Sequence, residues 1–323
     1  MQTVDESKKT QINKEEVFRV DRGVWGIKDT FVNCYVIQHN ETNEWILVDA
    51  GLKWSAPKIM AMAAKLFGAD SGPSAIVLTH GHFDHVGSLP HLLESWPVPV
   101  FAHELEMPYI TGLSSYPPVD PTVGGGMIAS LSFIFPKGPI DITPHVSKLP
   151  SDGTVPGFPE WRFIHTPGVA PGHISLFRAH DRLLLAGDAF LTTKAESTFH
   201  AVTYKETISG PPKYATCDWT MARASLEKLV ALRPEVVATG HGRPMRGSKM
   251  RKNLELLLHN FEQDAIPASG RYVNEPAVTN KFGVASCPVN TETIPAATRR
   301  ILSYSAIAMS AAMMFFQKLA RRV

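Results

Sequence analysis

The six residues from His80 to His85 most strongly limit what this chain can fold into and do. They place three histidines and an aspartate in the spacing H-x-H-x-D-H, directly after the apolar run 75–79. Imidazole and carboxylate groups are the usual protein ligands of zinc and related divalent ions. A buried strand that ends at Thr79 would deliver these side chains into a loop at a sheet edge, where they can converge. The segment therefore predicts a metal site rather than a solvated polar loop.

The composition narrows the class of protein. Hydrophobic residues make up 44% and charged residues 19% of the 323 residues, as in a globular protein with a sizeable core. The formal net charge is only +2, and no basic patch is interleaved with aromatic residues, so nucleic-acid binding is not expected. The three cysteines (Cys34, Cys217 and Cys287) are too few and too scattered for a disulfide framework. Residues 1–16 are polar and lack the apolar core of a secretory signal, so we expect a disordered lead-in and a cytoplasmic protein.

Short apolar runs closed by glycine, proline or polar residues dominate the chain and predict buried strands. These runs are 31–37, 45–49, 75–79, 98–102, 161–165, 173–178, 183–186 and 236–239. Helical patterns lie between some of them, at 56–67, 89–94, 220–232 and 249–263. Strands interleaved with helices indicate an α/β layered domain, which we place at residues 17–265.

Residues 107–160 depart from this pattern because they are rich in proline and glycine. A long irregular insertion in a compact domain often serves as a lid over an active site. Its larger apolar side chains would either line such a lid or only pack the loop against the body. They are Tyr109, Tyr116, Met127, Phe133 and Phe135.

The C-terminal extension 266–323 contains an uncharged run, 301–317, with basic residues on both sides. The run is close to the length of a membrane span, but its serines and alanines make it less apolar than a typical one. We expect a helix that docks on the body or on a second subunit, which would make the protein a homo-oligomer. Membrane contact is the minor alternative.

Five segments, in order along the chain, resemble the signature motifs of the metallo-β-lactamase superfamily. They are 47–51, 79–87, 164–168, 185–188 and 239–242, and the similarity extends from about residue 17 to residue 245. The resemblance implies an αββα sandwich, in which two mixed β-sheets pack face to face and helices flank them. The metal site of this fold lies at one edge of the sandwich. This architecture agrees with the order of strands and helices given above.

The resemblance also implies a set of metal ligands. The first ion would be bound by His80 and His82. The second would be bound by Asp84, His85 and His241, and the carboxylate of Asp188 would bridge both ions. The metal would be zinc, with one or two ions per chain and iron or manganese as alternatives. Asp49, which also ends a predicted strand, would orient the ligands, or else only form a turn before Ala50.

One position departs from the pattern of the family. Most members with two ions carry a histidine ligand of the first ion after Thr-Pro-Gly, and this chain has Val169 there. A valine cannot coordinate a metal, so the first ion is held weakly or His173 takes the place of the missing ligand. We expect His173 to support the other ligands rather than to bind the ion.

The predicted chemistry is hydrolysis by metal-activated water, because a divalent ion lowers the pKa of its water towards neutrality. Asp84 would orient this water and accept its proton, and Asp188 would complete the catalytic pair. No G-x-S-x-G motif and no phosphate-binding glycine loop occurs in the chain. We therefore predict a hydrolase acting on a small-molecule carboxylic ester, lactone or thioester.

Two alternatives stay open. The first is a mononuclear iron oxidoreductase of the same fold, which needs the histidine that Val169 replaces. The second is a non-catalytic metal-binding protein whose first site has degenerated.

Overall fold

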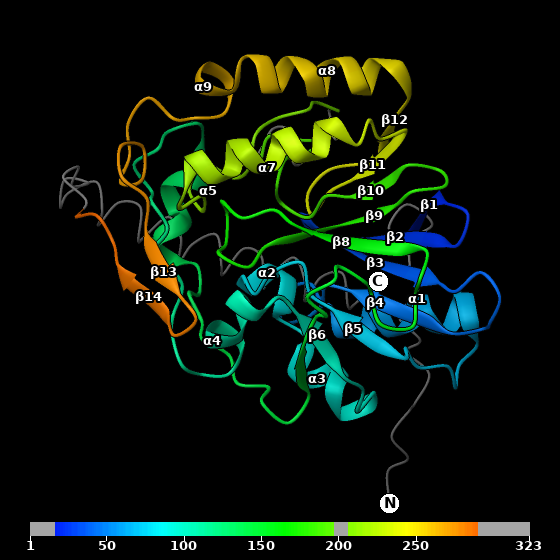
Figure 1. Cartoon of the computed structure of the whole chain (residues 1–323). Helices are drawn as coiled ribbons and strands as arrows, with labels where there is room; N and C mark the ends of the chain where they lie inside the picture. The colour runs from blue at the N-terminus through cyan, green and yellow to red at the C-terminus, as the bar shows by residue number, and fades with distance from the viewer. Residues whose placement is uncertain (1–16, 197–205, 290–323) are drawn as a thin grey trace, which may run out of the picture.

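The chain forms four layers, with two β-sheets face to face in the middle and helices over the outer face of each sheet (Figure 1). The computed structural model describes residues 17–196 and 206–289. The αββα sandwich expected from the sequence is therefore the observed architecture. The lead-in 1–16 and the apolar run 301–317 lie outside the described residues.

The first sheet contains seven strands in chain order. Its first four strands form an antiparallel meander, and the strands from β4 onward are parallel. The strands are β1 (Val17–Asp21), β2 (Val24–Asp29), β3 (Val32–Gln38), β4 (Trp45–Val48), β5 (Ala75–Val77), β6 (Val100–Ala102) and β7 (Val146–Lys148). Parallel neighbours need crossover connections, and two of these connections are the helices that cover the outer face, α1 (Ala56–Phe67) and α3 (Leu89–Ser95).

The second sheet contains five strands in the order β12-β11-β10-β9-β8. Only β10 and β11 are parallel, and α7 (Trp219–Ala231) is the crossover between them. The strands are β8 (Trp161–His165), β9 (Ile174–Arg178), β10 (Leu183–Leu185), β11 (Val236–Ala238) and β12 (Met245–Arg246). In Figure 1, α7 and α8 (Gly247–His259) lie above this sheet, and α9 (Phe261–Asp264) follows α8.

The proline- and glycine-rich region is only partly an insertion. The 3-10 helix η1 (Glu104–Glu106) precedes this region. The region itself contains the short helices α4 (Met107–Ile110) and α5 (Met127–Leu131) and the 3-10 helix η2 (Ser132–Ile134). Near its end β7 pairs with β6 and extends the first sheet. Beyond residue 265 the chain adds a hairpin, β13 (Val278–Asn280) and β14 (Gly283–Ser286).

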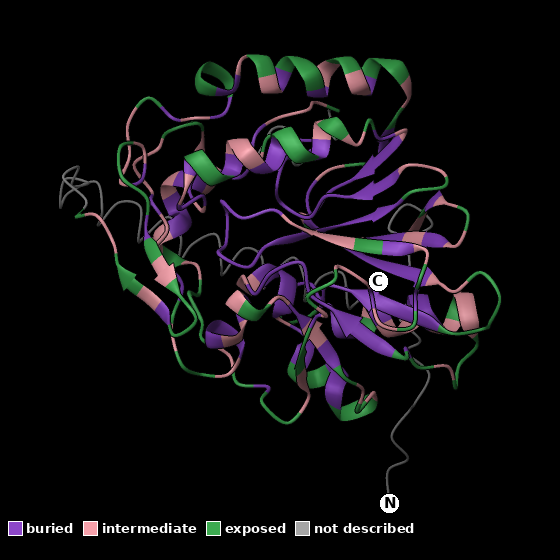
Figure 2. Ribbon diagram, viewed as in Figure 1, coloured by how far each residue is buried: buried purple, intermediate pink, exposed green. Residues whose placement is uncertain are grey.

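Successive side chains of a strand point to opposite faces, and here both faces are buried. In β3, Cys34 and Val36 pack into the core beneath α1 and α3, whereas Tyr35 and Ile37 pack into the core between the two sheets. Figure 2 accordingly shows the strands of both sheets largely in the colour of buried residues. The central strands are mostly apolar because neither face meets water, whereas the edge strand β8 carries the exposed Arg162. Among the described helices, none combines the length and the apolar character needed to cross a membrane.

Candidate metal centre

The predicted ligands converge at one edge of the sandwich because parallel strands end there. The histidine-rich segment follows β5, whose parallel neighbour is β4, and Asp188 and His241 follow the parallel pair β10 and β11. Two backbone hydrogen bonds join the sheets at this edge: Ile174 N–H donates to the Thr79 carbonyl at 2.9 Å, and Asn33 N–H to the Gly240 carbonyl at 2.8 Å. Segments that follow strands of both sheets therefore supply the site. Asp84 and His85 lie on the short helix α2 (Phe83–Val86) and not in a loop as the sequence suggested.

Two groups of potential ligand atoms lie close enough together to hold an ion each. One group is His80, His85 and Asp188, the other is Asp84, His85 and His241, and the ligand atoms of each lie within 4.8 Å of one another. All five side chains are buried. The structure differs from the predicted sets: His85 is within reach of both groups, His82 belongs to neither, and Asp188 belongs to only one.

Two buried atoms of these groups show that the donor set fits a cation. His85 Nε2 and Asp188 Oδ1 make no hydrogen bond to any described residue. A buried polar atom without a partner is costly, and a metal ion would satisfy both atoms. Gly240 leaves the necessary room, since a Cβ atom there would lie 2.1 Å from Asp188 Oδ1.

His80 and His82 present two nitrogen atoms to one point. His80 Nε2 and His82 Nδ1 are 3.0 Å apart, and two nitrogens bound tetrahedrally to one zinc ion would be about 3.3 Å apart. The Thr79 hydroxyl donates to Asp49 Oδ2 at 2.7 Å, so it must accept from His80 Nδ1, 3.1 Å away. This chain of hydrogen bonds leaves the Nε2 lone pair of His80 for an ion.

Asp49 holds the histidine-rich segment at two points. Its carboxylate accepts hydrogen bonds from Thr79 N–H at 2.7 Å and lies 2.9 Å from His85 Nδ1. The ring nitrogen that remains, His85 Nε2, faces the site. Asp49 has φ 62°, in the left-handed region that aspartate tolerates better than most residues. The observed contacts are those of an orienting residue, beyond a role in the turn.

His241 is oriented by a residue that the sequence motifs did not indicate. The Phe31 carbonyl lies 2.8 Å from His241 Nδ1, and the Phe31 ring stacks on the imidazole at 6.0 Å. The other ring nitrogen, Nε2, is then directed at Asp188 Oδ2, 3.2 Å away, and lies 3.6 Å from Asp84 Oδ2.

His173 uses both ring nitrogens within the protein. Its Nε2 accepts a hydrogen bond from the backbone N–H of Asp188 at 2.9 Å, and its Nδ1 lies 2.9 Å from the Thr166 hydroxyl. Burial lowers the pKa of His173 to about 3, so the ring stays neutral. In this arrangement His173 has no lone pair for an ion and instead fixes the backbone of Asp188. Val169 is buried, and Gly168 beside it accepts hydrogen bonds from Cys217 and Asp218.

The pKa values of the histidines in the site are shifted in opposite directions. Burial, followed by the neighbouring histidines, lowers the pKa of His80 well below its usual range and that of His82 to about 4. Burial also lowers the pKa of His85, but Asp188 and Asp49 outweigh this effect and raise it well above its usual range. The imidazoles of His80 and His82 are therefore neutral at pH 7, which is the form that binds metals.

Aromatic side chains close the cavity over the ligands. Tyr116 and Phe135 from the expected lid line this cavity, as does Tyr214, which sequence analysis missed. The other apolar lid residues contribute less directly: Tyr109 stacks on Tyr116 at 4.0 Å, and Met127 is 46% exposed. The cavity measures only about 30 Å³, which leaves no space for a substrate larger than a few atoms.

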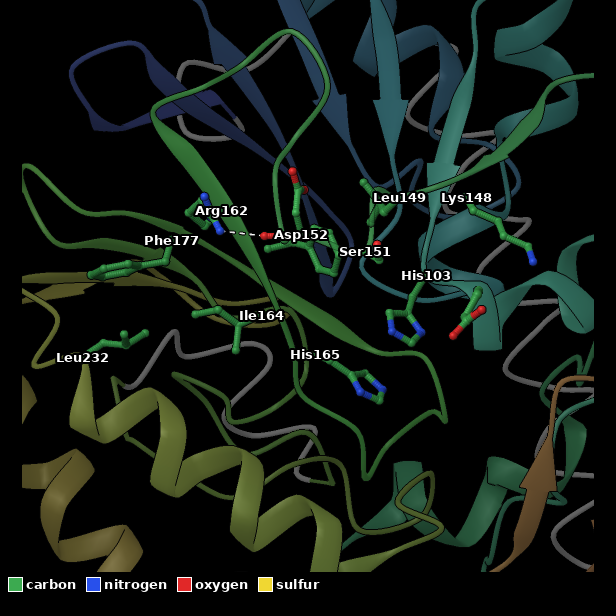
Figure 3. A pocket seen from close by; sticks show the side chains of 13 residues that line it. His103, Lys148, Leu149, Ser151, Asp152, Arg162, Ile164, His165, Phe177 and Leu232 are labelled. Carbon is green, nitrogen blue, oxygen red and sulfur yellow. Dashed lines mark hydrogen bonds between the residues drawn. The ribbon is translucent and has the colours of Figure 1, made fainter.

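A larger cavity of about 720 Å³ lies elsewhere, beside the edge strands β7 and β8 of the two sheets. Figure 3 shows the stacked rings of His103 and His165 on one side of it and the apolar side chains of Phe177 and Leu232 on the other. None of the residues that line it belongs to either ligand group.

The fold and the site agree with what is known of one family. A protein-family model described as "Metallo-beta-lactamase superfamily" matches residues 27–241 of the sequence, and the chain belongs to this superfamily. The "Probable metallo-hydrolase YflN" of Bacillus subtilis (strain 168) is 45% identical over 253 residues, which cover 78% of this chain and 96% of that protein. The predicted family and fold are confirmed.

Two solved structures show the same fold at low sequence identity. The archaeal superfamily protein ST1585 from Sulfolobus tokodaii superposes with a TM-score of 0.51 at 20% identity, covering 76% of this chain and 89% of its own. BJP-1, a subclass B3 metallo-β-lactamase of Bradyrhizobium japonicum, gives a TM-score of 0.52 at 20% identity, covering 77% and 92% of the two chains. Identities this low support the fold alone.

Proposed function

We propose that this chain is a metal-dependent hydrolase that cleaves a carboxylic ester, lactone or thioester in a small molecule with an apolar portion. The observation that carries the proposal is the pair of buried ligand groups that share His85, with two ligand atoms left without hydrogen bonds. The name of the Bacillus subtilis relative, a probable metallo-hydrolase, supports the hydrolytic reaction. The aromatic residues over the site support an apolar substrate.

The two ions would be held by different sets of side chains. His80 and His82 would bind the first ion, and Asp84, His85 and His241 would bind the second; Asp188 would contribute to both, and His85 is also within reach of the first. A nitrogen- and carboxylate-rich set suits zinc, and iron or manganese fits the same ligands. A bound divalent ion supplies a water molecule of lowered pKa and polarises an acyl carbonyl.

The side chains around the ions would carry the remaining steps. Asp84 Oδ2 lies 3.6 Å from His241 Nε2 and 4.0 Å from His85 Nε2, so the carboxylate is placed to hold a water molecule and accept its proton. Burial and the carboxylates of Asp84 and Asp188 raise the pKa of Tyr214 well above its usual range. The Tyr214 hydroxyl therefore keeps its proton and can donate a hydrogen bond to the oxygen that gains charge in the reaction.

Substrate entry must displace part of the aromatic cover, because the cavity of about 30 Å³ is too small for an ester with an acyl chain. Phe135 contacts Tyr214 and Phe83 at ring distances of 5.8 and 5.1 Å. Opening between Phe135 and Tyr214 would uncover His241 and Asp84 from the solvent side. After closure, the same rings would exclude bulk water and strengthen the interactions inside the site.

The test is the variant Asp188→Asn, assayed against panels of lactones, aliphatic esters and thioesters after loading with zinc. The variant keeps the shape of the side chain but removes the negative charge between the ions. We expect it to lose most of its bound zinc and at least a hundredfold in kcat/KM. Asp70→Asn, which changes an exposed aspartate outside the site, is the matched control and should behave as the parent.

A parent protein that binds zinc but hydrolyses none of the three panels would rule out the proposed reaction. An iron-dependent oxidation in that same protein would instead identify the oxidoreductase alternative. Near-normal zinc content in Asp188→Asn would show that the ligand assignment is wrong.

A further inference from the structure

Glu106 is a fully buried carboxylate outside both ligand groups. It lies at the end of η1, and three donors point at it. Gly172 N–H donates to Oε1 at 2.7 Å, Gly81 N–H donates to Oε2 at 2.9 Å, and the Tyr116 hydroxyl also donates to Oε2. An arrangement of three donors around one side chain suits an ionised carboxylate, which only accepts hydrogen bonds.

The three donors belong to three different walls of the metal centre. Gly81 lies between His80 and His82, and Gly172 precedes His173 in the loop that carries Val169. Tyr116 belongs to the aromatic cover, and its ring lies 4.6 Å from the His82 ring. Glu106 is therefore the common attachment point of the segments around the first ion.

The close packing around Glu106 accounts for glycine at both backbone donors. A Cβ atom at Gly81 would lie 2.5 Å from the Tyr116 hydroxyl, and one at Gly172 would lie 2.8 Å from the Glu106 side chain. Any larger residue would push the backbone N–H away from the carboxylate. The H-G-H and P-G-H sequences thus fit this one buried group.

Burying a carboxylate without hydrogen bonds would be strongly unfavourable, and a protein has simpler ways to pack a core. The cost is offset here because each hydrogen bond fixes a segment that bears on the site. The first ion has particular need of this, because Val169 stands where the resemblance to the superfamily places a further histidine ligand. Two histidines that differ by only two positions hold an ion well only if their backbone is fixed in advance.

We propose that Glu106 is a positioning residue, which sets the spacing of His80 and His82 for the first ion. It takes over part of the restraint that a third histidine would provide. The second ion, held by Asp84, His85 and His241, depends much less on Glu106 because none of these residues contacts it in the described structure. The proposal rests on the metal assignment made under the proposed function.

The experiment is a titration of Glu106→Gln with zinc and with cobalt(II), followed by bound metal and by visible absorption. Glutamine has the same shape but one oxygen fewer, so either Gly81 N–H or Gly172 N–H must face an amide N–H group. We expect the first ion to bind at least about tenfold more weakly, in the range found for residues that support ligands, while the second ion binds as in the parent. In assays kcat should fall while KM changes little, because the substrate does not touch Glu106.

Three further variants separate this role from general effects on stability. Glu104→Gln changes an exposed carboxylate on the same turn and should leave both affinities unchanged. Tyr116→Phe removes one of the three donors and should weaken the binding of the first ion by a smaller factor than Glu106→Gln does. Tyr109→Phe removes a buried hydroxyl that has no hydrogen bond to a described residue and should have no effect on either ion.

Unchanged affinity for both ions in a folded Glu106→Gln protein would overturn the proposal. So would an equal loss of both ions together with a lower melting temperature of the metal-free protein, since that result indicates a purely structural role. If Glu106→Gln fails to fold, Tyr116→Phe decides by the same two criteria. The metal titrations and the melting temperatures require no substrate, so the absence of hydrolysis in the parent would contradict the proposed function without affecting these results.

Discussion

Val169 and His173 lie four positions apart in one loop, and the structure gives them different tasks. The sequence indicated that Val169 removes a ligand and that His173 either replaces it or supports the others. The hydrogen bond from Asp188 N–H to His173 Nε2 is between residues 15 positions apart, so no local pattern could have predicted it. The residue types in the site could be predicted, whereas the direction of each ring nitrogen could not.

The variant Val169→His should restore a third imidazole to the first ion. We expect this ion to bind about ten- to a hundredfold more tightly, as for other added or lost interactions at metal sites, with the second ion unchanged. A competitive zinc titration measures both affinities. Val169→Leu, which keeps an apolar side chain of similar size, is the control and should leave both affinities close to those of the parent.

If Val169→His binds the first ion no more tightly than the parent does, the loop does not bring residue 169 to the ion. A parent with two equally tight ions would mean that His80, His82 and Asp188 suffice without a further ligand.

Glu106, Phe31 and Tyr214 show where sequence analysis of the site reached its limit. Each acts on partners far away in the chain: Glu106 is 25 and 66 positions from its two glycine donors, and Phe31 is 210 positions from His241. The motifs indicated the candidate ligands because those residues follow strand ends in a fixed spacing. The residues that hold them have no such spacing and emerge only from the folded structure.

Among the elements, long apolar runs were the easiest to predict. All eight predicted strands and the helix at 56–67 appear within about two residues of their expected ends, because strands with both faces largely buried read as mainly apolar runs. The first two strands were missed because Arg19 and Lys28 interrupt their apolar pattern. Strand β12 spans only two residues, and β7 (V-S-K) is partly exposed, so neither forms an apolar run that could be recognised in the sequence.

The His103–His165 stack connects two of these elements and should make stability depend on pH. His103 is the N-cap of η1, where it accepts from Leu105 N–H, and its ring lies 4.1 Å from that of His165. Burial, and then His165, lowers the pKa of His103 to about 4 from 6.5. As the pH falls, the unfolded chain protonates this histidine before the folded protein does. The free energy of unfolding is therefore highest above about pH 6.5 and decreases as the pH falls towards 4.

We expect His103→Asn to reduce this pH dependence, because asparagine can still cap η1 but does not titrate. Between pH 6.5 and 4.5 the metal-free variant should lose on the order of 1–2 kcal/mol less stability than the parent, allowing for the partial exposure of the ring. Urea unfolding in the presence of a chelator measures this at each pH. His91→Asn, at an exposed histidine, is the control, and equal pH slopes for parent and His103→Asn would refute the assignment.

At the scale of the whole molecule, the metal centre joins the two sheets. The histidine-rich segment follows a strand of the first sheet, and Asp188 and His241 follow strands of the second. An ion bound by both sets stabilises the folded state alone, because the unfolded chain does not bring the ligands together. Metal content and the stability of the sandwich are therefore linked.

Removal of the metal should lower the melting temperature of the parent by about 5–10 °C. This estimate takes a free metal concentration of about a hundred times Kd, which corresponds to about 2.7 kcal/mol. Differential scanning calorimetry with and without a chelator measures the shift. In Asp188→Asn the chelator should change the melting temperature little, and an unchanged value in the parent would show that the sheets do not depend on the ion.

The order of strands in the first sheet has a consequence for the protein while it is being synthesised. Because β1 to β7 are neighbours in chain order, this sheet contains its own pairing partners by residue 148. Its inner face, which includes Tyr35 and Ile37, stays uncovered until β8–β11 have been synthesised and pack against it. The last ligand, His241, leaves the ribosome after almost all of the second sheet. A nascent chain therefore exposes the complete histidine-rich segment long before it can hold an ion in the way the finished protein does.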